Sequence, residues 1–109
     1  MTLLLNEQPE TDVRRIESGN DQSMDFRETS GILKALGHPA RLEIVHNLMR
    51  DECNVDNMVK RLGIPQSTVS QHLRILQDRG IISPRKQGVI TCYSVVDQRV
   101  RDIVDLLKR

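Results

Sequence analysis

The stretch "IPQSTVSQHLRIL", Ile64 to Leu76, decides the fold of this chain. Val69, Leu73 and Leu76 recur at the spacing of the buried face of an α-helix. The first turns carry short or neutral hydrogen-bonding side chains: Gln66, Ser67, Thr68, Ser70 and Gln71. This pattern predicts a helix with one face in a core and the other able to form hydrogen bonds with a partner.

The first helical segment upstream begins near Phe26 and places Ile32, Leu33 and Leu36 on one apolar face. The tripeptide "GHP", residues 37–39, interrupts it. Glycine is suited to a helix end and proline to the first turn of the next helix, so a second helix is expected to begin here.

Two further helices are predicted between this break and the opening stretch. The second is "PARLEIVHNLMR", residues 39–50, and its apolar stripe is formed by Leu42, Val45 and Leu48 or Met49. The third is "NVDNMVKRL", residues 54–62, with Asn54 as its N-cap and Gly63 as its stop. The fourth helix, which contains the opening stretch, ends at Gly80.

Beyond Gly80 the apolar period changes from that of a helix to that of a strand. The segments "IIS", residues 81–83, and "VITCYSV", residues 89–95, are predicted strands around the loop "PRKQG". Alternation places Val89, Thr91, Tyr93 and Val95 on one face and Ile90, Cys92 and Ser94 on the other. A last helix follows, with apolar positions at Val96, Val100, Ile103, Val104 and Leu107.

The predicted fold is therefore mostly α with a small β-hairpin, in the order α-α-α-α-β-β-α. Two short helices joined by "LGIPQ", residues 62–66, form a helix-turn-helix, and a hairpin directly after it makes a winged helix-turn-helix. The second helix of such a motif presents its N-terminal residues to base edges in the major groove of DNA. Glutamine can bind adenine through two hydrogen bonds, and serine or threonine can bind several bases or phosphate.

The charge distribution supports this reading. The net charge of +1 is uneven, since residues 1–30 hold seven acids against three arginines, whereas residues 31–109 hold thirteen basic residues against eight acids. Between Lys60 and Gly88 there are six basic residues and one acid, Asp78. A local basic region in a nearly neutral protein indicates a site that meets an anion. Arg85 and Lys86, at the hairpin, are expected to contact the DNA backbone or minor groove.

The chain length predicts one folded domain, residues 26–109. Residues 1–25 are polar, acidic and aperiodic, and are predicted to be disordered. No apolar run approaches the ~18 residues of a membrane span, and "TLLL" near the start is followed by acids, unlike a signal peptide. Two distant cysteines do not make a disulfide framework, so the chain is expected to be cytoplasmic and reduced.

The chain resembles the ArsR/SmtB family of bacterial winged-helix repressors. The matching stretches are "LKALGHPARLEIVHNL", "NVDNMVKRLGIPQSTVSQHLRILQDRGII" and "RKQGVITCYSV". The resemblance implies a homodimer that is held by its first and last helices, binds an inverted-repeat operator in double-stranded DNA and represses transcription. By position, it implies DNA contacts from Gln66, Ser67, Thr68, Ser70, Gln71 and Arg74 and from the wing residues Arg85 and Lys86.

The metal sites of that family are not matched. Where members that bind metal through the third helix have "CVC", this chain has Asn54, Val55 and Asp56. The last helix carries aspartates and no histidine, whereas borderline and soft metals prefer histidine or cysteine. We therefore expect neither a metal nor another cofactor. The sequence does not indicate an inducer.

The two cysteines are expected to differ. Cys53 precedes the Asn54 cap, and Met58 follows at the fourth helical position, which is the arrangement of a hydrophobic staple. Cys92 lies on the strand face opposite Tyr93, so it is expected to point outward if Tyr93 faces the core. An exposed thiol near basic residues is a candidate redox switch. No disulfide between the two cysteines is expected, and His38, His46 and His72 are read as structural.

The sequence favours two other classes of function less strongly. An enzyme is disfavoured, because the chain has no nucleophile with a nearby base motif, no phosphate-binding glycine loop and no zinc-hydrolase spacing. A winged-helix module that binds protein instead of DNA is the remaining alternative. The basic run through the fourth helix and the wing argues against it.

Overall fold

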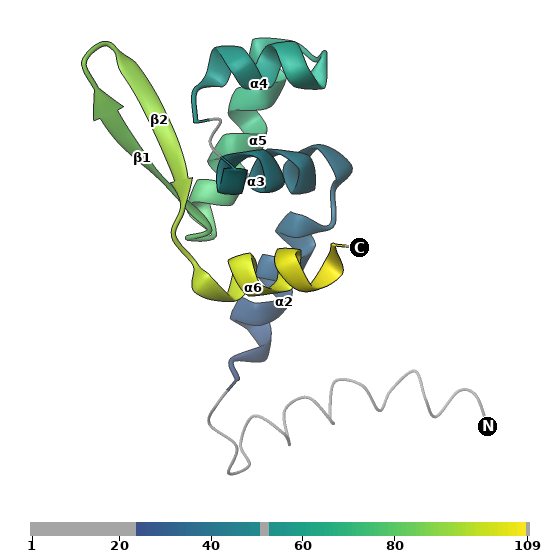
Figure 1. Ribbon diagram of the computed structural model, residues 1–109. Coiled ribbons are helices and arrows are strands. Elements are labelled where there is room, and N and C mark those ends of the chain that lie inside the picture. Colours follow the sequence, from purple (N-terminus) through teal and green to yellow (C-terminus); the bar gives the residue numbers. More distant parts are fainter. Residues whose placement is uncertain (1–23, 51–52, 109) are drawn as a thin grey trace, which may run out of the picture. The chain divides into compact units, whose positions relative to one another are not determined.

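The computed structural model describes residues 24–50 and 53–108, which form five helices and one hairpin (Figure 1). Their order is α2 (Phe26–Leu36), α3 (Pro39–Arg50), α4 (Val55–Leu62), α5 (Gln66–Asp78), β1 (Ile82–Gln87), β2 (Ile90–Val95) and α6 (Gln98–Leu107). The predicted winged helix-turn-helix is thus confirmed. Most of the segment predicted to be disordered, residues 1–25, lies outside the described residues.

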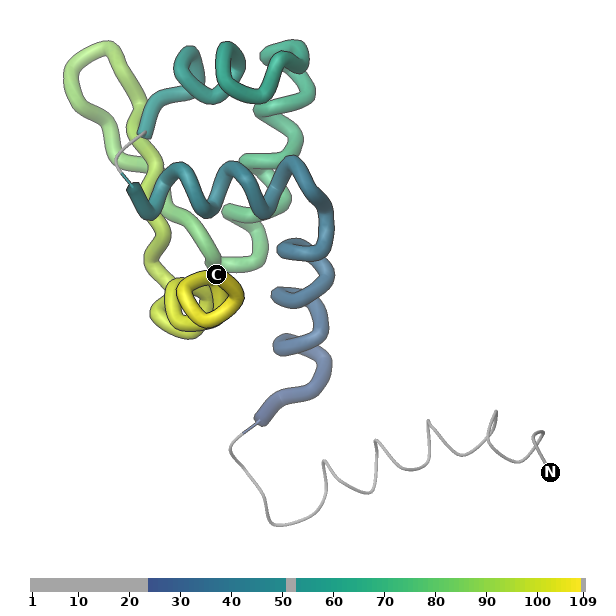
Figure 2. The backbone as a smooth tube through the Cα atoms, turned by 45° about the vertical axis from the view of Figure 1, so that its right-hand side comes forward, coloured from purple at the N-terminus to yellow at the C-terminus, as the bar shows by residue number. Residues whose placement is uncertain are grey.

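The chain divides after Gly31 into two units, and the second, residues 32–109, carries the core. Within this unit α3 lies between α4 and α6, and it also contacts α5 and strand β2 (Figure 2). Aliphatic side chains fill the interior, and the largest fully buried ones are Ile44, Met58, Leu76, Ile81, Ile82, Val45, Val69 and Val100. These side chains come from every helix of the motif and from the hairpin. Their burial fixes the helix-turn-helix against the wing.

The predicted helix boundaries around the motif are confirmed, with a physical cause at each. The Asn54 side chain accepts a hydrogen bond of 2.9 Å from the backbone N–H of Asn57, so it caps α4. Gly63 ends that helix in the left-handed conformation at φ 70°, which a residue without Cβ adopts at no steric cost. Helix α5 ends two residues before Gly80, which has φ 75°.

Four apolar positions predicted for the helices are more exposed than expected, namely Leu33, Leu42, Val96 and Leu107, and Val96 precedes α6. Leu33 is 50% exposed, whereas Ile32, Ala35 and Leu36 of the same helix are buried. Leu33 points away from the buried face, because one residue rotates a side chain by about 100° around a helix. Leu107, at the end of α6, is 65% exposed, while the preceding apolar position of the stripe, Val104, is buried.

The hairpin is longer than predicted, because part of the expected loop belongs to β1. The ladder runs from Ile82 opposite Val95 to Gln87 opposite Ile90 and leaves Gly88 and Val89 as a two-residue turn. Gly88 has φ 67°, which permits so tight a turn. The basic residues predicted for the loop, Arg85 and Lys86, therefore lie on a paired strand.

A short segment pairs with the other edge of β2. The carbonyl oxygen of Cys53 accepts a hydrogen bond of 3.0 Å from the backbone N–H of Tyr93, and Asn54 forms an isolated antiparallel bridge with Cys92. The start of α4 is thereby attached to the wing. This contact joins segments 39 residues apart.

Candidate nucleic-acid interface

Helix α5 separates its buried and exposed faces as expected. Val69, Leu73 and Leu76 are at most 3% exposed and anchor the helix in the core. The predicted DNA-binding side chains lie on the rest of its surface, where Gln66, Ser67, Ser70, Gln71 and Arg74 are exposed and Thr68 is half-buried. The exposed set recurs about once per helical turn, so it forms one continuous polar face.

The N-terminus of α5 is open to an anion. Pro65 occupies the N-cap and provides no side-chain hydrogen bond. Its carbonyl oxygen accepts from the backbone N–H groups of Thr68 and Val69, at 3.0 and 3.1 Å, so the two N–H groups before them precede the first intrahelical bonds. Backbone N–H groups in this position, at the positive end of the helix dipole, can donate to a phosphate.

A cluster of His38, Arg41 and His72 holds α5 against the start of α3. The Arg41 side chain donates to the carbonyl oxygen of Ala35 through Nε, at 2.7 Å, and its Nη1 lies 3.3 Å from Nδ1 of His72. A guanidinium group only donates, so Nδ1 accepts and the His72 ring is neutral. The rings of His38 and His72 are tilted against each other, with centroids 4.6 Å apart.

The surroundings of His72 oppose its protonation. Burial lowers the pKa of the His72 imidazole, and the charges of His38 and Arg41 lower it further. A neutral His72 keeps its acceptor for Arg41, so the same arrangement that lowers the pKa also fixes the recognition helix. The sequence had indicated only that His72 bonds within the fold; its partners are 31 and 34 residues away, and no local pattern identifies them.

The wing presents two exposed cations beside the helix-turn-helix. Arg85 and Lys86 extend from β1, opposite Cys92 and Thr91 respectively. A third cation, Arg74 on α5, forms an exposed ion pair of 3.5 Å with Asp78 one turn along the helix. Such a pair contributes little to stability in water, so the guanidinium can exchange Asp78 for a phosphate at small cost.

Two expectations for Cys92 are wrong: that its side chain points outward, and that it forms no disulfide with Cys53. Its side chain is only 7% exposed, and it forms a disulfide with Cys53, with the two Cα atoms 4.6 Å apart. Strand alternation correctly separated Cys92 from Tyr93, but both faces of β2 are at least partly covered. The Cys53–Asn54 segment pairs with the free edge of β2, a long-range pairing that alternation within β2 could not anticipate.

Among the described residues, no three His, Cys, Asp or Glu side chains come close enough together to hold a metal ion. The positions aligned with the family's metal ligands in the third helix instead serve the local structure: Asn54 caps α4, and Asp56 lies in its first turn. None of the described helices is long and apolar enough to cross a bilayer.

Residues 38–83 match the family described as "Bacterial regulatory protein, arsR family". The transcriptional repressor PagR of Bacillus anthracis is 35% identical over 77% of this chain and 85% of its own length. The transcriptional activator HlyU of Vibrio cholerae is 33% identical over 83% of this chain and 85% of its own. The biofilm growth-associated repressor of Xylella fastidiosa strain 9a5c is 30% identical over 88% of this chain and 84% of its own.

Solved structures of two of these relatives are similar to the structure of this chain. The structure of HlyU from Vibrio cholerae superposes with a TM-score of 0.72 at 29% identity and covers 78% of this chain and 92% of its own. That of PagR gives a TM-score of 0.69 at 34% identity and covers 76% of this chain and 95% of its own. The protein belongs to the ArsR family of winged helix-turn-helix transcription regulators. It is a DNA-binding regulator and not an enzyme.

Proposed function

We propose that this regulator is a homodimeric repressor that binds an inverted-repeat operator, with residues 26–109 providing both DNA binding and dimerisation. The observation that carries the proposal is the continuous polar face of α5, with an uncapped N-terminus, beside the exposed cations of the wing. Its place of action is the cytoplasm, where the DNA of a bacterial-type cell lies. We propose no cofactor.

In this arrangement α5 lies in the major groove. Gln66 and Gln71 are long enough to reach base edges, where a glutamine amide pairs with adenine through two hydrogen bonds. Ser67, Thr68 and Ser70 bind bases or the nearest phosphates. Arg74, Arg85 and Lys86 contact phosphates on either side, and these contacts position the protein without reading sequence.

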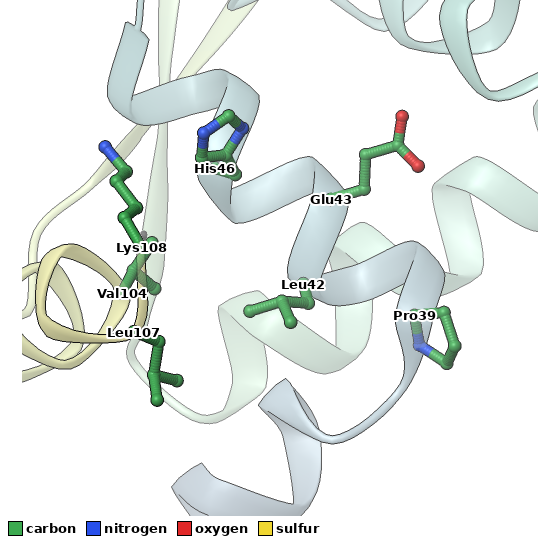
Figure 3. Close-up of a pocket in the computed structure, with 7 residues that line it drawn as sticks. All are labelled: Pro39, Leu42, Glu43, His46, Val104, Leu107 and Lys108. Carbon is green, nitrogen blue, oxygen red and sulfur yellow. The ribbon is translucent and has the colours of Figure 1, made fainter.

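Dimerisation through the first and last helices is supported by apolar side chains left in solvent. Leu33 of α2 is 50% exposed, and Leu106 and Leu107 of α6 are 82% and 65% exposed. A groove of about 390 Å³ lies between α3 and α6 (Figure 3), lined by Pro39, Leu42, Glu43, His46, Val104, Leu107 and Lys108. A second copy that covered these leucines would gain about 25 cal/mol for each Å² of apolar surface buried.

Repression follows from occupying a promoter, and two of the three relatives named above are repressors. The test is footprinting of the DNA upstream of its own gene, combined with a promoter–reporter strain that has or lacks the protein. We expect protection of two half-sites about one helical turn apart and a rise in reporter output when the protein is absent.

Two controls sharpen the test. A double variant, Gln66→Ala with Gln71→Ala, should lose the footprint while remaining folded, because both side chains are exposed. Zinc, cadmium and arsenite should leave the footprint unchanged. A fall in reporter output without the protein would make it an activator, as HlyU is named, and a folded protein that binds no DNA would favour the protein-interaction alternative.

A further inference from the structure

The disulfide joins the two parts of the DNA interface. Cys53 directly precedes the Asn54 cap of α4, the first helix of the helix-turn-helix. Cys92 lies in β2, opposite the wing cation Arg85. The Cα separation of 4.6 Å is within the range usual for disulfides, and one backbone hydrogen bond and one bridge already hold the segments together.

We propose that Cys53 and Cys92 form a reversible dithiol–disulfide site that exchanges with small thiol–disulfide couples, and that the oxidised form strengthens DNA binding by holding the wing against α4. The coupling to DNA rests on the operator binding proposed above. Disulfides in reducing compartments are usually transient and redox-sensing, which favours a switch over a permanent crosslink.

The two cysteines of the disulfide differ in their exposure to solvent. Cys92 is 7% exposed, whereas Cys53 is only partly buried. A groove of about 240 Å³ is lined by residues that follow Cys53 and residues that precede Cys92, but not by the cysteines themselves: Asn54, Val55, Asp56, Val89, Ile90 and Thr91. Because Cys53 is the less buried of the two, the incoming small thiolate in our proposal attacks the sulfur of Cys53, with the Cys92 sulfur as the leaving group.

The exchange is balanced in both directions. For reduction, the incoming thiolate forms a mixed disulfide with Cys53 and releases the Cys92 thiolate, which takes up a proton. A second thiol then attacks the mixed disulfide, releasing the Cys53 thiolate and leaving the reductant as its own disulfide. Two electrons and two protons pass from two thiols to the protein. Oxidation by a small-molecule disulfide reverses these steps.

The reduced state is also accommodated. The side-chain oxygen Oε1 of Gln87 lies 3.6 Å from Sγ of Cys92, so it can accept the weak hydrogen bond of a Cys92 thiol. The backbone bond between Tyr93 and Cys53 does not depend on the sulfurs. Reduction should therefore loosen the wing without unfolding it.

When the disulfide is reduced, ordering the wing on DNA costs more free energy. Arg85, the pairing partner of Cys92, and its neighbour Lys86 must be held in one position to meet phosphates. A preorganised contact avoids part of the ordering cost of binding, and we expect the oxidised protein to bind its operator about threefold to tenfold more tightly than the reduced protein.

The experiment measures redox state and operator affinity together. The protein is equilibrated in oxidised and reduced glutathione, its thiols are counted by mass spectrometry after alkylation, and operator binding is measured in each buffer. We expect a reversible two-thiol transition accompanied by the change in affinity. The variant Cys53→Ser should bind with the reduced wild-type affinity in both buffers. Cys92→Ser should do the same, since its hydroxyl retains the Gln87 acceptor.

Two matched variants separate wing positioning from general stability. In Arg85→Ala with Lys86→Ala, the ratio of oxidised to reduced affinity should approach one, because the wing no longer contributes the contacts. In Arg74→Ala, which removes a cation from α5, affinity should fall but the ratio should remain. A pair that does not oxidise, or equal affinities in both states of the wild type, would overturn the proposal. Loss of operator binding in every state would overturn the proposed function and the coupling with it.

Discussion

The residues proposed to contact DNA divide into those that can read bases and those that can contact only phosphate. Gln66→Ala or Gln71→Ala should weaken operator binding by about 1–3 kcal/mol and leave binding to unrelated DNA nearly unchanged, because only base contacts depend on sequence. Lys86→Ala should weaken binding to both DNAs. Titrations of each variant with operator and scrambled duplexes measure the difference.

The comparison between Gln66→Ala and Lys86→Ala tests whether Gln66 contacts bases and Lys86 contacts phosphate. Both side chains are exposed, so neither substitution should disturb the core. If the two variants lost the same binding free energy on both duplexes, the division of roles between α5 and the wing would be wrong.

His72 gives the protein a predictable dependence on pH. Its folded-state pKa is lowered by burial and by the nearby His38 and Arg41, so the unfolded chain binds the proton more tightly. Stability contributed by a neutral His72 is therefore complete above its ordinary pKa of about 6.5 and declines as the pH falls from there toward the folded value. Urea unfolding at about pH 7.5 and 5.5 should show this loss.

In His72→Gln, where an amide oxygen can still accept from Arg41, the loss between the two pH values should be smaller. His46→Gln, which lies outside the cluster, is the matched control and should keep the wild-type dependence. An unchanged loss in His72→Gln would mean that this residue is not the titrating group.

At the scale of elements, the turn between α4 and α5 depends on one backbone conformation. Gly63 has φ 70°, and a side chain in that region costs about 1–2 kcal/mol even though nothing lies within 4 Å of the position of its Cβ. Gly63→Ala should lower the free energy of unfolding by that amount, as measured by denaturant titration.

Gly37→Ala serves as the control for the turn. Its Cβ would lie 3.4 Å from the carbonyl oxygen of Leu33, an ordinary contact, and its φ is not positive. We expect little change in stability. Equal losses for the two substitutions would mean that the left-handed conformation of Gly63 is not the cause, because the effect on the unfolded chain stabilises both variants.

The elements also show where local pattern suffices. Asn54 and Gly63 bound α4 as predicted, because a cap and a left-handed stop are properties of a few adjacent residues. The hairpin was predicted too short, because Pro84 and the charges after it resemble a loop. They pair because the turn at Gly88 brings a complementary strand opposite them, which the residues of β1 do not reveal by themselves.

At the scale of the whole molecule, the proposed dimer would set the salt dependence of binding. Each phosphate contact contributes roughly 0.9 to the slope of the logarithm of the binding constant against that of the salt concentration. A dimer carries two copies of Lys86, so Lys86→Ala should reduce the slope by about 1.8. A fluorescence anisotropy series in potassium chloride measures it.

Sedimentation of the free protein completes that test. A monomer bound singly to DNA would change its slope by only about 0.9, and a slope indifferent to salt would contradict phosphate contact altogether. A dimer that dissociates in Leu106→Glu would connect the exposed leucines of α6 to assembly.

The sequence by itself determined the order of the elements, the buried and exposed faces of α5 and the basic character of the wing. Each of these depends on the spacing of neighbouring residues, which sets the face that a side chain occupies. Only the tertiary structure decided that Cys53 meets Cys92, and that Arg41 and His38 meet His72. Those contacts join segments more than thirty residues apart, and their existence depends on how the whole core packs, since no local period encodes the distance between two elements.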